Sequence, residues 1–482
     1  MTSLLFKGGV LVTSKGQEKM DILVKDGKVE EMGREEGMRD AGERTSLRSV
    51  RGLFIFSNVT DGHVHFREPG GTQKEDFETG SRAAAAGGIT TILDMPNNQP
   101  SIASRETLEE KRKLISRKAY VNYGLYMGAT FDSATGHTNI DEYLASDAVA
   151  FKVYMGSSTG NLLVDQPSYL EEIFKKASEK DRLIVVHAED EALMKENLKR
   201  FSGLEDPTLH SKIRDGEVAY RSVKLALHLA KKYGTRMHIA HLSTGRELEE
   251  FAKFKSDRIS CEVAPHHLFL TEEELAKQGN FAKMNPPLRT EADCKALLEG
   301  IRSGLVDMVA TDHAPHTMDE KKQPYSKAPS GVPGEETMLP LLLDVVHHGD
   351  LTLEQVARVV SEGPARVFRL KSGGELKVGS SASFTGVDMT DEHTVENGGF
   401  GARYTKCGWS AYAGRLLRGW PVLTVVNGEV VFRDGEILGK PLGREIEVAG
   451  FPLPSAVSWT FGCICCTMRT GSFFNLSIYG RR

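Results

Sequence analysis

Long apolar runs are missing from this chain of 482 residues. None reaches the roughly 18 residues that suggest a membrane-spanning helix, so we expect no membrane partner. Residues 1–7 lack the basic start and long apolar core of a secretory signal peptide, and none is expected. An excess of positive charge is also missing, because the formal net charge is −5. We therefore expect no nucleic acid as a partner.

Cysteine is scarce and unevenly placed. The six cysteines are Cys261, Cys294, Cys407, Cys463, Cys465 and Cys466. This spacing does not resemble a disulfide framework, so a reduced cytoplasm is the expected location. The last three fall within Gly450–Arg482, whose composition breaks with the preceding chain. Because no second spaced pair or histidine accompanies them, we expect an atypical, poorly ordered tail over residues 450–482 rather than a metal site.

Short apolar runs alternate with longer charged stretches from His63 to about residue 345. Segments such as Ser168–Lys180 and Asp215–Tyr233 carry apolar residues at helical spacing. Alternating units of this kind predict an α/β protein with a (β/α)8 TIM-like barrel, whose active site lies at the C-terminal strand ends. The eight expected strands are Ile55–His65, Gly88–Met95, Tyr120–Met127, Ala148–Tyr154, Leu183–His187, Met237–His241, Ile259–Ala264 and Met308–Thr311.

Both ends of the chain carry a different, purely β pattern. Val422–Val426 and Glu429–Phe432 flank the dipeptide Asn427-Gly428, which is a strong signal for a hairpin turn. We expect residues 1–54 and 366–449 to combine into one small β-sandwich domain beside the barrel. The barrel itself is expected over residues 55–365.

The tripeptide His63-Val64-His65 is the first candidate for chemistry. Residues i and i+2 of a strand face the same side, so both imidazoles can meet one metal ion. The apolar run Leu53–Phe56 before them is expected to be the buried part of the same strand. Two residues later, Arg67 places a planar cation where it could grip a carboxylate. A lone His-x-His is more often a coincidence, so the metal interpretation depends on further ligands.

Further ligand candidates stand at the ends of other expected strands: Lys152, His187, His241 and Asp312. Each alone is more often a satisfied core residue, or for the lysine an edge-strand residue that reaches solvent. On one barrel they would converge on one mouth. Imidazole and carboxylate suit Zn²⁺, and two ions about 3.5–4 Å apart can share a hydroxide. Lys152 fits this set only as a carbamate formed by CO₂ on its neutral amine, and Asp312 suits a catalytic base.

Seven motifs carry a resemblance to a known family. On these motifs the chain resembles the amidohydrolase superfamily, and within it the dihydroorotases, over about residues 55–440. It departs from the family pattern at Phe56–Thr60, where Pro-Gly is usual, which leaves the geometry before His63 open. The motifs are Asp61–Gly70, Asp94–Asn98, Phe151–Val153, Val186–Glu189, Cys261–His267, Met284–Arg289 and Ala310–His316.

The resemblance implies a fold, a reaction and a role for each matching residue. The implied reaction is the reversible cyclisation of N-carbamoyl-L-aspartate to L-dihydroorotate in de novo pyrimidine (UMP) biosynthesis. One zinc ion would be bound by His63, His65 and Asp312, and a second by His187 and His241. Carboxylated Lys152 would bridge the two ions, and Asp312 would be the catalytic residue. Substrate contacts would come from His65, Arg67, Asn97, Asn285, His316, Ser330 and Gly331.

Three alternatives are weighed against this expectation. Allantoinase and dihydropyrimidinase share the barrel, the His-x-His pair and the lysine, and fold alone says nothing about substrate. Arg67 with Asn97 favours dihydroorotase, because an anionic substrate needs the arginine and a neutral ring does not. The third is a catalytically silent homologue that acts as an assembly partner; such proteins typically lose metal ligands, and all six candidates are present here. The metal in the cell and homo-oligomerisation stay open.

Overall fold

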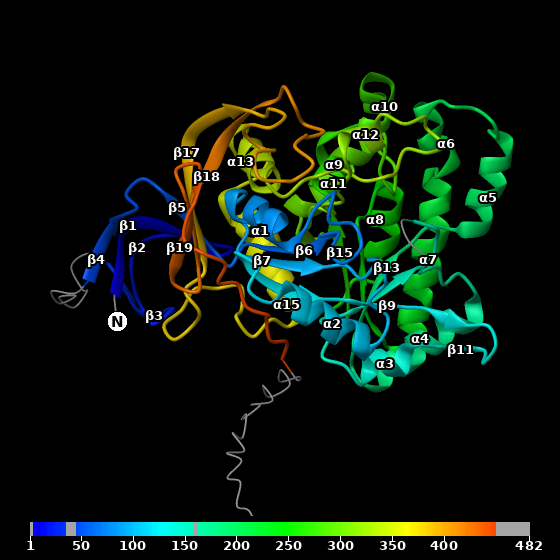
Figure 1. Cartoon of the computed structure of the whole chain (residues 1–482), viewed down its shortest axis with the longest axis horizontal. Coiled ribbons are helices and arrows are strands. Elements are labelled where there is room, and N and C mark those ends of the chain that lie inside the picture. Colours follow the sequence, from blue (N-terminus) through cyan, green and yellow to red (C-terminus); the bar gives the residue numbers. More distant parts are fainter. Residues whose placement is uncertain (1–2, 35–44, 159–161, 450–482) are drawn as a thin grey trace, which may run out of the picture.

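The computed structural model describes residues 3–34, 45–158 and 162–449 (Figure 1). The tail expected at residues 450–482 therefore lies outside the described residues. Within the described ranges, no helix is long and apolar enough to cross a membrane. The chain folds into a (β/α)8 barrel with a β-sandwich domain formed by both chain ends, so the predicted fold class is confirmed.

The barrel is closed by parallel strand pairing. Hydrogen bonds join β6 to β8 in one sheet and β9 to β16 in another. Only Tyr126 separates β8 from β9, and a parallel bridge between Val64 and His313 connects the two outer ends. Each of the eight expected runs overlaps a barrel strand, and the run Tyr120–Met127 overlaps two, β8 and β9. These strands are β6 (Thr60–Val64), β7 (Thr91–Asp94), β8 (Asn122–Leu125), β9 (Met127–Gly128), β12 (Phe151–Tyr154), β13 (Leu183–His187), β14 (Arg236–Ile239), β15 (Ile259–Val263) and β16 (Met308–Val309).

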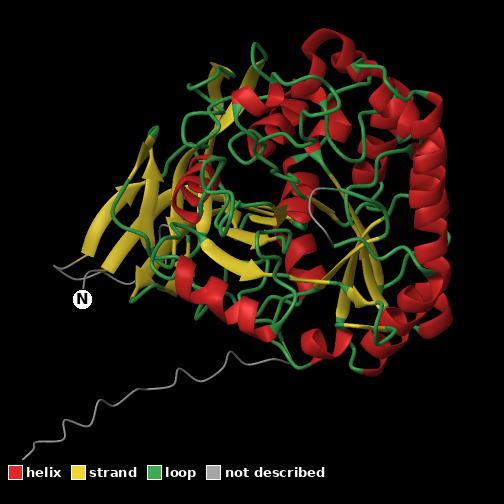
Figure 2. Ribbon diagram, turned by 45° about the vertical axis from the view of Figure 1, so that its right-hand side comes forward, coloured by secondary structure: helices red, strands yellow, loops and turns green. Residues whose placement is uncertain are grey.

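Helices cover the outside of the barrel (Figure 2). Local sequence sets their ends: the Asp215 carboxylate accepts the first free N–H groups of α7, and Gly234, at φ 69°, ends this helix. The helices are α1 (Phe77–Ala86), α2 (Arg105–Ile115), α3 (Ile140–Leu144), α4 (Pro167–Glu179), α5 (Glu191–Arg200), α6 (His210–Ile213), α7 (Gly216–Tyr233), α8 (Gly245–Ala252), α9 (Pro265–Phe269), α10 (Glu273–Gln278), α11 (Glu291–Arg302), α12 (Met318–Lys321), α13 (Met338–His347), α14 (Leu353–Ala357) and α15 (Gly363–Phe368).

Shorter elements lie in the connecting segments. A small hairpin pairs β10 (Phe131–Asp132) with β11 (His137–Thr138). The 3₁₀ turns η1 (Pro207–Leu209) and η2 (Gly279–Ala282) precede α6 and follow α10, and a π-helical turn η3 (Arg358–Glu362) joins α14 to α15.

The second domain contains strands from both ends of the chain. β5 pairs in parallel with β1 and antiparallel with β17, which joins the N-terminal strands to the C-terminal ones. The rings of Phe6 and Phe384 meet edge to face at 4.9 Å in its core. The predicted Asn427-Gly428 hairpin is confirmed, with φ angles of 50° and 86°. The strands are β1 (Ser3–Thr13), β2 (Gly16–Lys25), β3 (Lys28–Gly33), β4 (Thr45–Ser49), β5 (Phe54–Ser57), β17 (Phe384–Thr394), β18 (Leu416–Val426), β19 (Glu429–Arg433) and β20 (Glu436–Ile437).

The single strand expected over Ile55–His65 is wrong, because the chain changes sheets within it. β5 belongs to the second domain, and β6 begins the barrel. Between them, Asn58 takes φ 39°, and its side-chain amide donates to the Gly373 carbonyl oxygen at 2.9 Å. Asn tolerates this left-handed conformation better than most residues. The apolar run therefore packs in the other sheet, and the expected boundary at residue 54 falls inside β5. The domain limits stay a prediction.

Candidate metal and substrate site

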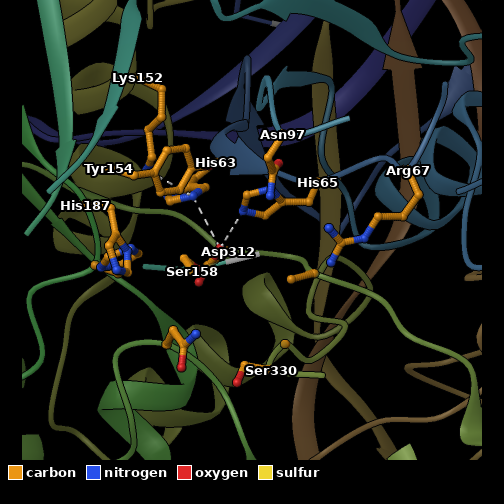
Figure 3. A pocket seen from close by; sticks show the side chains of 14 residues that line it. His63, His65, Arg67, Asn97, Lys152, Tyr154, Ser158, His187, Asp312 and Ser330 are labelled. Atoms are coloured by element: carbon orange, nitrogen blue, oxygen red, sulfur yellow. Dashed lines mark hydrogen bonds and ion pairs between the residues drawn. The ribbon is translucent and has the colours of Figure 1, made fainter. Parts of the chain in front are cut away.

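A pocket at the C-terminal ends of the barrel strands collects the predicted site residues (Figure 3). His316 lies beside this pocket, with Nε2 3.3 Å from an Arg67 nitrogen. Tyr154 and Ser158 also line the pocket, although the sequence did not identify them. The predicted residues in the lining are His63, His65, Arg67, Asn97, Lys152, His187, His241, Asn285, Asp312, Ser330 and Gly331.

His63, His65 and Asp312 form one side of the cluster. The Asp312 Oδ1 atom lies 3.3 Å from Nε2 of His63 and 3.0 Å from Nε2 of His65. The two imidazole centroids are 5.2 Å apart, as expected for side chains on one face of a strand end. One ligand atom each from His63, His241 and Asp312 lie within 4.8 Å of one another, which is a compact arrangement for a metal ion.

His187, His241 and Lys152 form the other side. Nδ1 of His187 lies 2.9 Å from Nε2 of His241, and the Lys152 Nζ lies 3.5 Å from Nε2 of His63. Lys152 is fully buried on β12, which pairs with β9 and β13, so it is not an edge-strand lysine that reaches solvent. Burial lowers the pKa of its ammonium to about 8, which makes the neutral amine accessible near neutral pH.

Two acceptors orient the His-x-His pair. Nδ1 of His63 lies 2.6 Å from Oε1 of Glu262, and Nδ1 of His65 lies 2.6 Å from Oδ1 of Asn97. Because both oxygens accept hydrogen bonds, both Nδ1 atoms carry the hydrogen. The Nε2 atoms then face Asp312, on the side where a metal ion would be bound.

A carboxylate also orients His187, but it contacts Nε2 and not Nδ1 of this ring. Its Nε2 lies 2.8 Å from Oε2 of Glu189, and that carboxylate is held by Arg214 with 3.1 Å between Nε and Oε1. Nδ1 of His187 is therefore the nitrogen left for a ligand. Nδ1 of His241 is buried and has no partner in the part of the chain that the structure describes.

The charges of the cluster match those of metal ligands. Burial lowers the pKa of His63 to about 4 and also lowers the pKa values of His187 and His241, so these imidazoles are neutral. Burial alone would raise the pKa of Asp312, but His63 and His65 hold it well below its usual range. Neutral imidazoles and an ionised carboxylate are the forms that bind a divalent cation, so the donor set fits Zn²⁺.

The backbone turns sharply where His241 and Asp312 leave their strands. Their φ angles are 37° and 48°, in the left-handed region that side-chain-bearing residues rarely adopt. The Glu262 carboxylate accepts the His241 N–H at 3.2 Å, and the buried Asp61 carboxylate accepts the N–H of Thr311 at 3.0 Å. These contacts support the strained turns and point both side chains toward the barrel mouth.

A cationic region lies beside the metal-ligand candidates. Arg67 is 8% exposed, and its guanidinium points into the pocket from the side opposite His187 (Figure 3). Its Nε donates to the Pro315 carbonyl oxygen at 3.2 Å. Among residues 3–34, 45–158 and 162–449, no carboxylate forms an ion pair with it. A buried cation of this kind suits an anionic ligand.

A buried lysine shapes the loop that carries Ser330 and Gly331. Lys321 is 1% exposed, and its ammonium donates to three carbonyl oxygens, those of Lys283, Pro329 and Gly331. Gly331 has φ 140°, and a Cβ there would lie 2.5 Å from the Ala314 carbonyl oxygen, so only glycine fits.

Some of the residues that support the site could have been predicted from the sequence, and others could not. Glu262 is a buried acid inside an apolar strand, and Tyr154 stands two residues after Lys152 on the same strand face. Both lie in or next to predicted motifs and could have been identified. The sequence around Lys321 and Ser158 is typical of surface residues, because only the folded loops bring them to the site.

Three sequence relatives cover almost the whole chain. The model of the Amidohydrolase family matches residues 54–431. A dihydroorotase of Pyrococcus abyssi is 36% identical over 427 residues, covering 89% of this chain and 94% of the relative. The dihydroorotase of Methanosarcina acetivorans is 35% identical over 442 residues, covering 89% and 92%. That of Bacillus cereus is 34% identical over 445 residues, covering 90% and 99%.

Solved structures show the same architecture. An L-hydantoinase (dihydropyrimidinase) from Arthrobacter aurescens superposes with a TM-score of 0.86 at 30% identity, covering 93% of this chain and 100% of the other. A dihydropyrimidinase from Brevibacillus agri gives 0.85 at 22% identity, covering 94% and 100%. At 22% identity, the likeness to the Brevibacillus agri structure concerns the fold alone.

Proposed function

Since this chain belongs to the amidohydrolase family, we propose that it is a dihydroorotase, which interconverts N-carbamoyl-L-aspartate and L-dihydroorotate in pyrimidine biosynthesis. The sequence relatives named above support this activity. The observation that carries the proposal is the position of Arg67, a buried guanidinium beside the metal-ligand candidates. Both compounds carry a carboxylate, which a guanidinium can hold with two parallel hydrogen bonds.

The proposed cofactor is a pair of zinc ions. Bound ions would supply Lewis acidity, which polarises an amide carbonyl and lowers the pKa of water. Carboxylation of Lys152 is proposed because its buried amine, with a pKa of about 8, is sufficiently unprotonated to react with CO₂. The residues that would hold the ions are His63, His65, Lys152, His187, His241 and Asp312.

The substrate would be held by the chain's own donors on the other side of the pocket. Arg67 would bind the carboxylate, with Asn97 and His316 beside it. Ser330 and Gly331 border the same space and would contact the ring. Fixing the carboxylate in this way orients the ring relative to Asp312.

Asp312 is the proposed proton carrier. Its lowered pKa keeps it ionised, so it can accept the proton of the attacking water during ring opening. It would return that proton to the ring nitrogen as the amide bond breaks. Ring closure follows the same path in reverse, starting from the protonated carboxyl group: Asp312 takes the proton of the ureido nitrogen and passes it to the hydroxyl group that leaves the carboxyl carbon as water.

A hydantoinase-type or dihydropyrimidinase-type activity is the second candidate, since the Arthrobacter aurescens structure is so similar. A hydantoin or dihydropyrimidine ring carries no carboxylate, so Arg67 would remain a buried charge without a counter-ion. The test is purified, zinc-loaded protein supplied in turn with L-dihydroorotate, N-carbamoyl-L-aspartate, allantoin, hydantoin and dihydrouracil. Turnover of the first two supports the proposal. Turnover of one of the others without them refutes it, and no turnover at all would favour a catalytically silent homologue.

A further inference from the structure

Asn285 lines the pocket, and its side-chain amide contacts a buried histidine that the proposed reaction does not use. This histidine is His210, the first residue of α6, and it is 4% exposed. Its Nε2 lies 3.0 Å from the Met284 carbonyl oxygen and 2.9 Å from Oδ1 of Asn285. Its Nδ1 lies 3.0 Å from the hydroxyl oxygen of Tyr325. Both ring nitrogens are therefore engaged.

The partners determine which nitrogen carries the hydrogen. A backbone carbonyl oxygen only accepts hydrogen bonds, so the contact with Met284 places the hydrogen of His210 on Nε2. Burial, with contributions from Arg214 and Lys283, lowers the pKa of this imidazole to about 3, so the ring is neutral. Nδ1 then has a lone pair, which accepts the Tyr325 hydroxyl hydrogen.

This tautomer in turn fixes the orientation of the Asn285 amide. With hydrogen on Nε2 of His210, the nearby atom of Asn285 is its oxygen, because an NH₂ group would place two donors against each other. The NH₂ group then lies on the other branch of the amide. Asn285 lines the pocket, and its NH₂ group is the half of the amide that His210 does not hold. A donor selects an acceptor, such as a carbonyl oxygen.

We propose that His210 is a positioning residue that holds the Asn285 amide so that its nitrogen donates to the ureido carbonyl oxygen of the cyclic substrate. This inference rests on the proposed function and adds a second point of recognition, away from the carboxylate beside Arg67. The ureido carbonyl is the ring carbonyl that is not attacked, so the contact affects binding more than the chemical step.

Tyr325 is itself held in place, which makes the arrangement rigid. The Lys283 ammonium lies 4.3 Å from the centre of the Tyr325 ring and donates to the Tyr325 carbonyl oxygen at 2.8 Å. The neighbours of His210 along the chain, Leu209 and Ile213, belong to an apolar cluster against which Tyr325 packs. An apolar side chain would suit this packing, so a histidine with both nitrogens engaged indicates a polar role.

The test compares His210→Gln with His210→Met, which have similar length but differ in the donor. Glutamine can place an N–H close to the imidazole Nε2 position, whereas methionine cannot. We expect the methionine variant to raise KM for L-dihydroorotate about tenfold with kcat within about twofold, because a buried acceptor is left free and the amide can rotate. Glutamine should restore KM to within about threefold of the wild type. Equal KM values for the two variants would overturn the proposal.

A sulfur analogue tests the selected group directly. 2-Thio-dihydroorotate replaces the ureido oxygen by a weaker acceptor, so the wild type should prefer the oxygen compound and His210→Met should lose most of that preference. An unchanged preference overturns the proposal. If the methionine variant does not fold, Tyr325→Phe takes its place, because it removes the donor to Nδ1 and should raise KM about threefold. An unchanged KM in Tyr325→Phe would also overturn the proposal.

The tautomer can be measured without turnover. In protein labelled with ¹⁵N-histidine, the shifts of the two ring nitrogens distinguish the neutral tautomers, and the signals missing from His210→Gln identify His210. The Nε2–H form supports the proposal, and the Nδ1–H form overturns it. A wild type that converts neither dihydroorotate nor carbamoyl aspartate would refute the proposed function and the substrate named here, whereas the tautomer result bears on His210 alone.

Discussion

Glu262 accepts a hydrogen bond from His63 in the barrel interior, with 2.6 Å between Oε1 and Nδ1. The same carboxylate accepts the backbone N–H of His241 at 3.2 Å, and its Oε2 lies 3.1 Å from Nε2 of His238. One acid on β15 therefore connects β6 to the end of β14. Burial would raise the pKa of Glu262, but His63 and His238 lower it, so it remains a carboxylate.

Glu262→Gln should weaken metal binding while the fold is kept. The amide preserves the size of the side chain but removes the charge that fixes the hydrogen on Nδ1 of His63. Loss of such a partner typically costs about 10- to 100-fold in metal affinity. Competition with a zinc chelator measures this affinity, and Glu299→Gln, at an exposed side chain, is the matched control. An affinity equal to that of the control would show that Glu262 does not act on the metal site.

Lys152→Ala should lose the bridging ligand and most of the activity. Wild-type protein supplied with ¹³C-bicarbonate and zinc should show a carbamate carbon signal in the NMR spectrum, and the variant should not. Zinc content should fall as well, because one ligand shared by both proposed ions is removed. Lys175→Ala, at an exposed lysine, controls for the loss of a positive charge. Full activity in Lys152→Ala would refute the carbamate role.

The metal-free protein should lose stability as the pH falls. The pKa of His63 is lowered from 6.5 to about 4 by burial, and that of His210 from 6.5 to about 3. Below pH 6.5 the unfolded chain therefore binds protons that the native state does not, so the free energy of unfolding decreases down to about pH 4. Urea unfolding between about pH 7 and pH 5 measures this change. A constant unfolding free energy over that range would contradict the buried, neutral state of these histidines.

Sequence patterns were sufficient to select ligand candidates that the structure brings together, because the barrel has a simple geometry. His63, His187 and Asp312 stand where apolar runs end, and parallel strands bring such ends to one mouth. The change of sheet at Asn58 could not be predicted, because one polar residue inside an apolar run does not reveal a left-handed turn. The contact between His210, at the start of α6, and Asn285 joins residues that are 75 positions apart, and no local pattern encodes it.

The selectivity between two rings that differ by one carboxylate tests the central claim most directly. Dihydrouracil is dihydroorotate without this group, so kcat/KM for the two substrates should be measured with zinc-loaded wild type and Arg67→Met. The wild type should prefer dihydroorotate, and the variant should lose about a hundredfold or more of that preference, because a buried charge-assisted pair is removed. Preference for dihydrouracil in the wild type, or an equal preference in both proteins, would contradict the assignment.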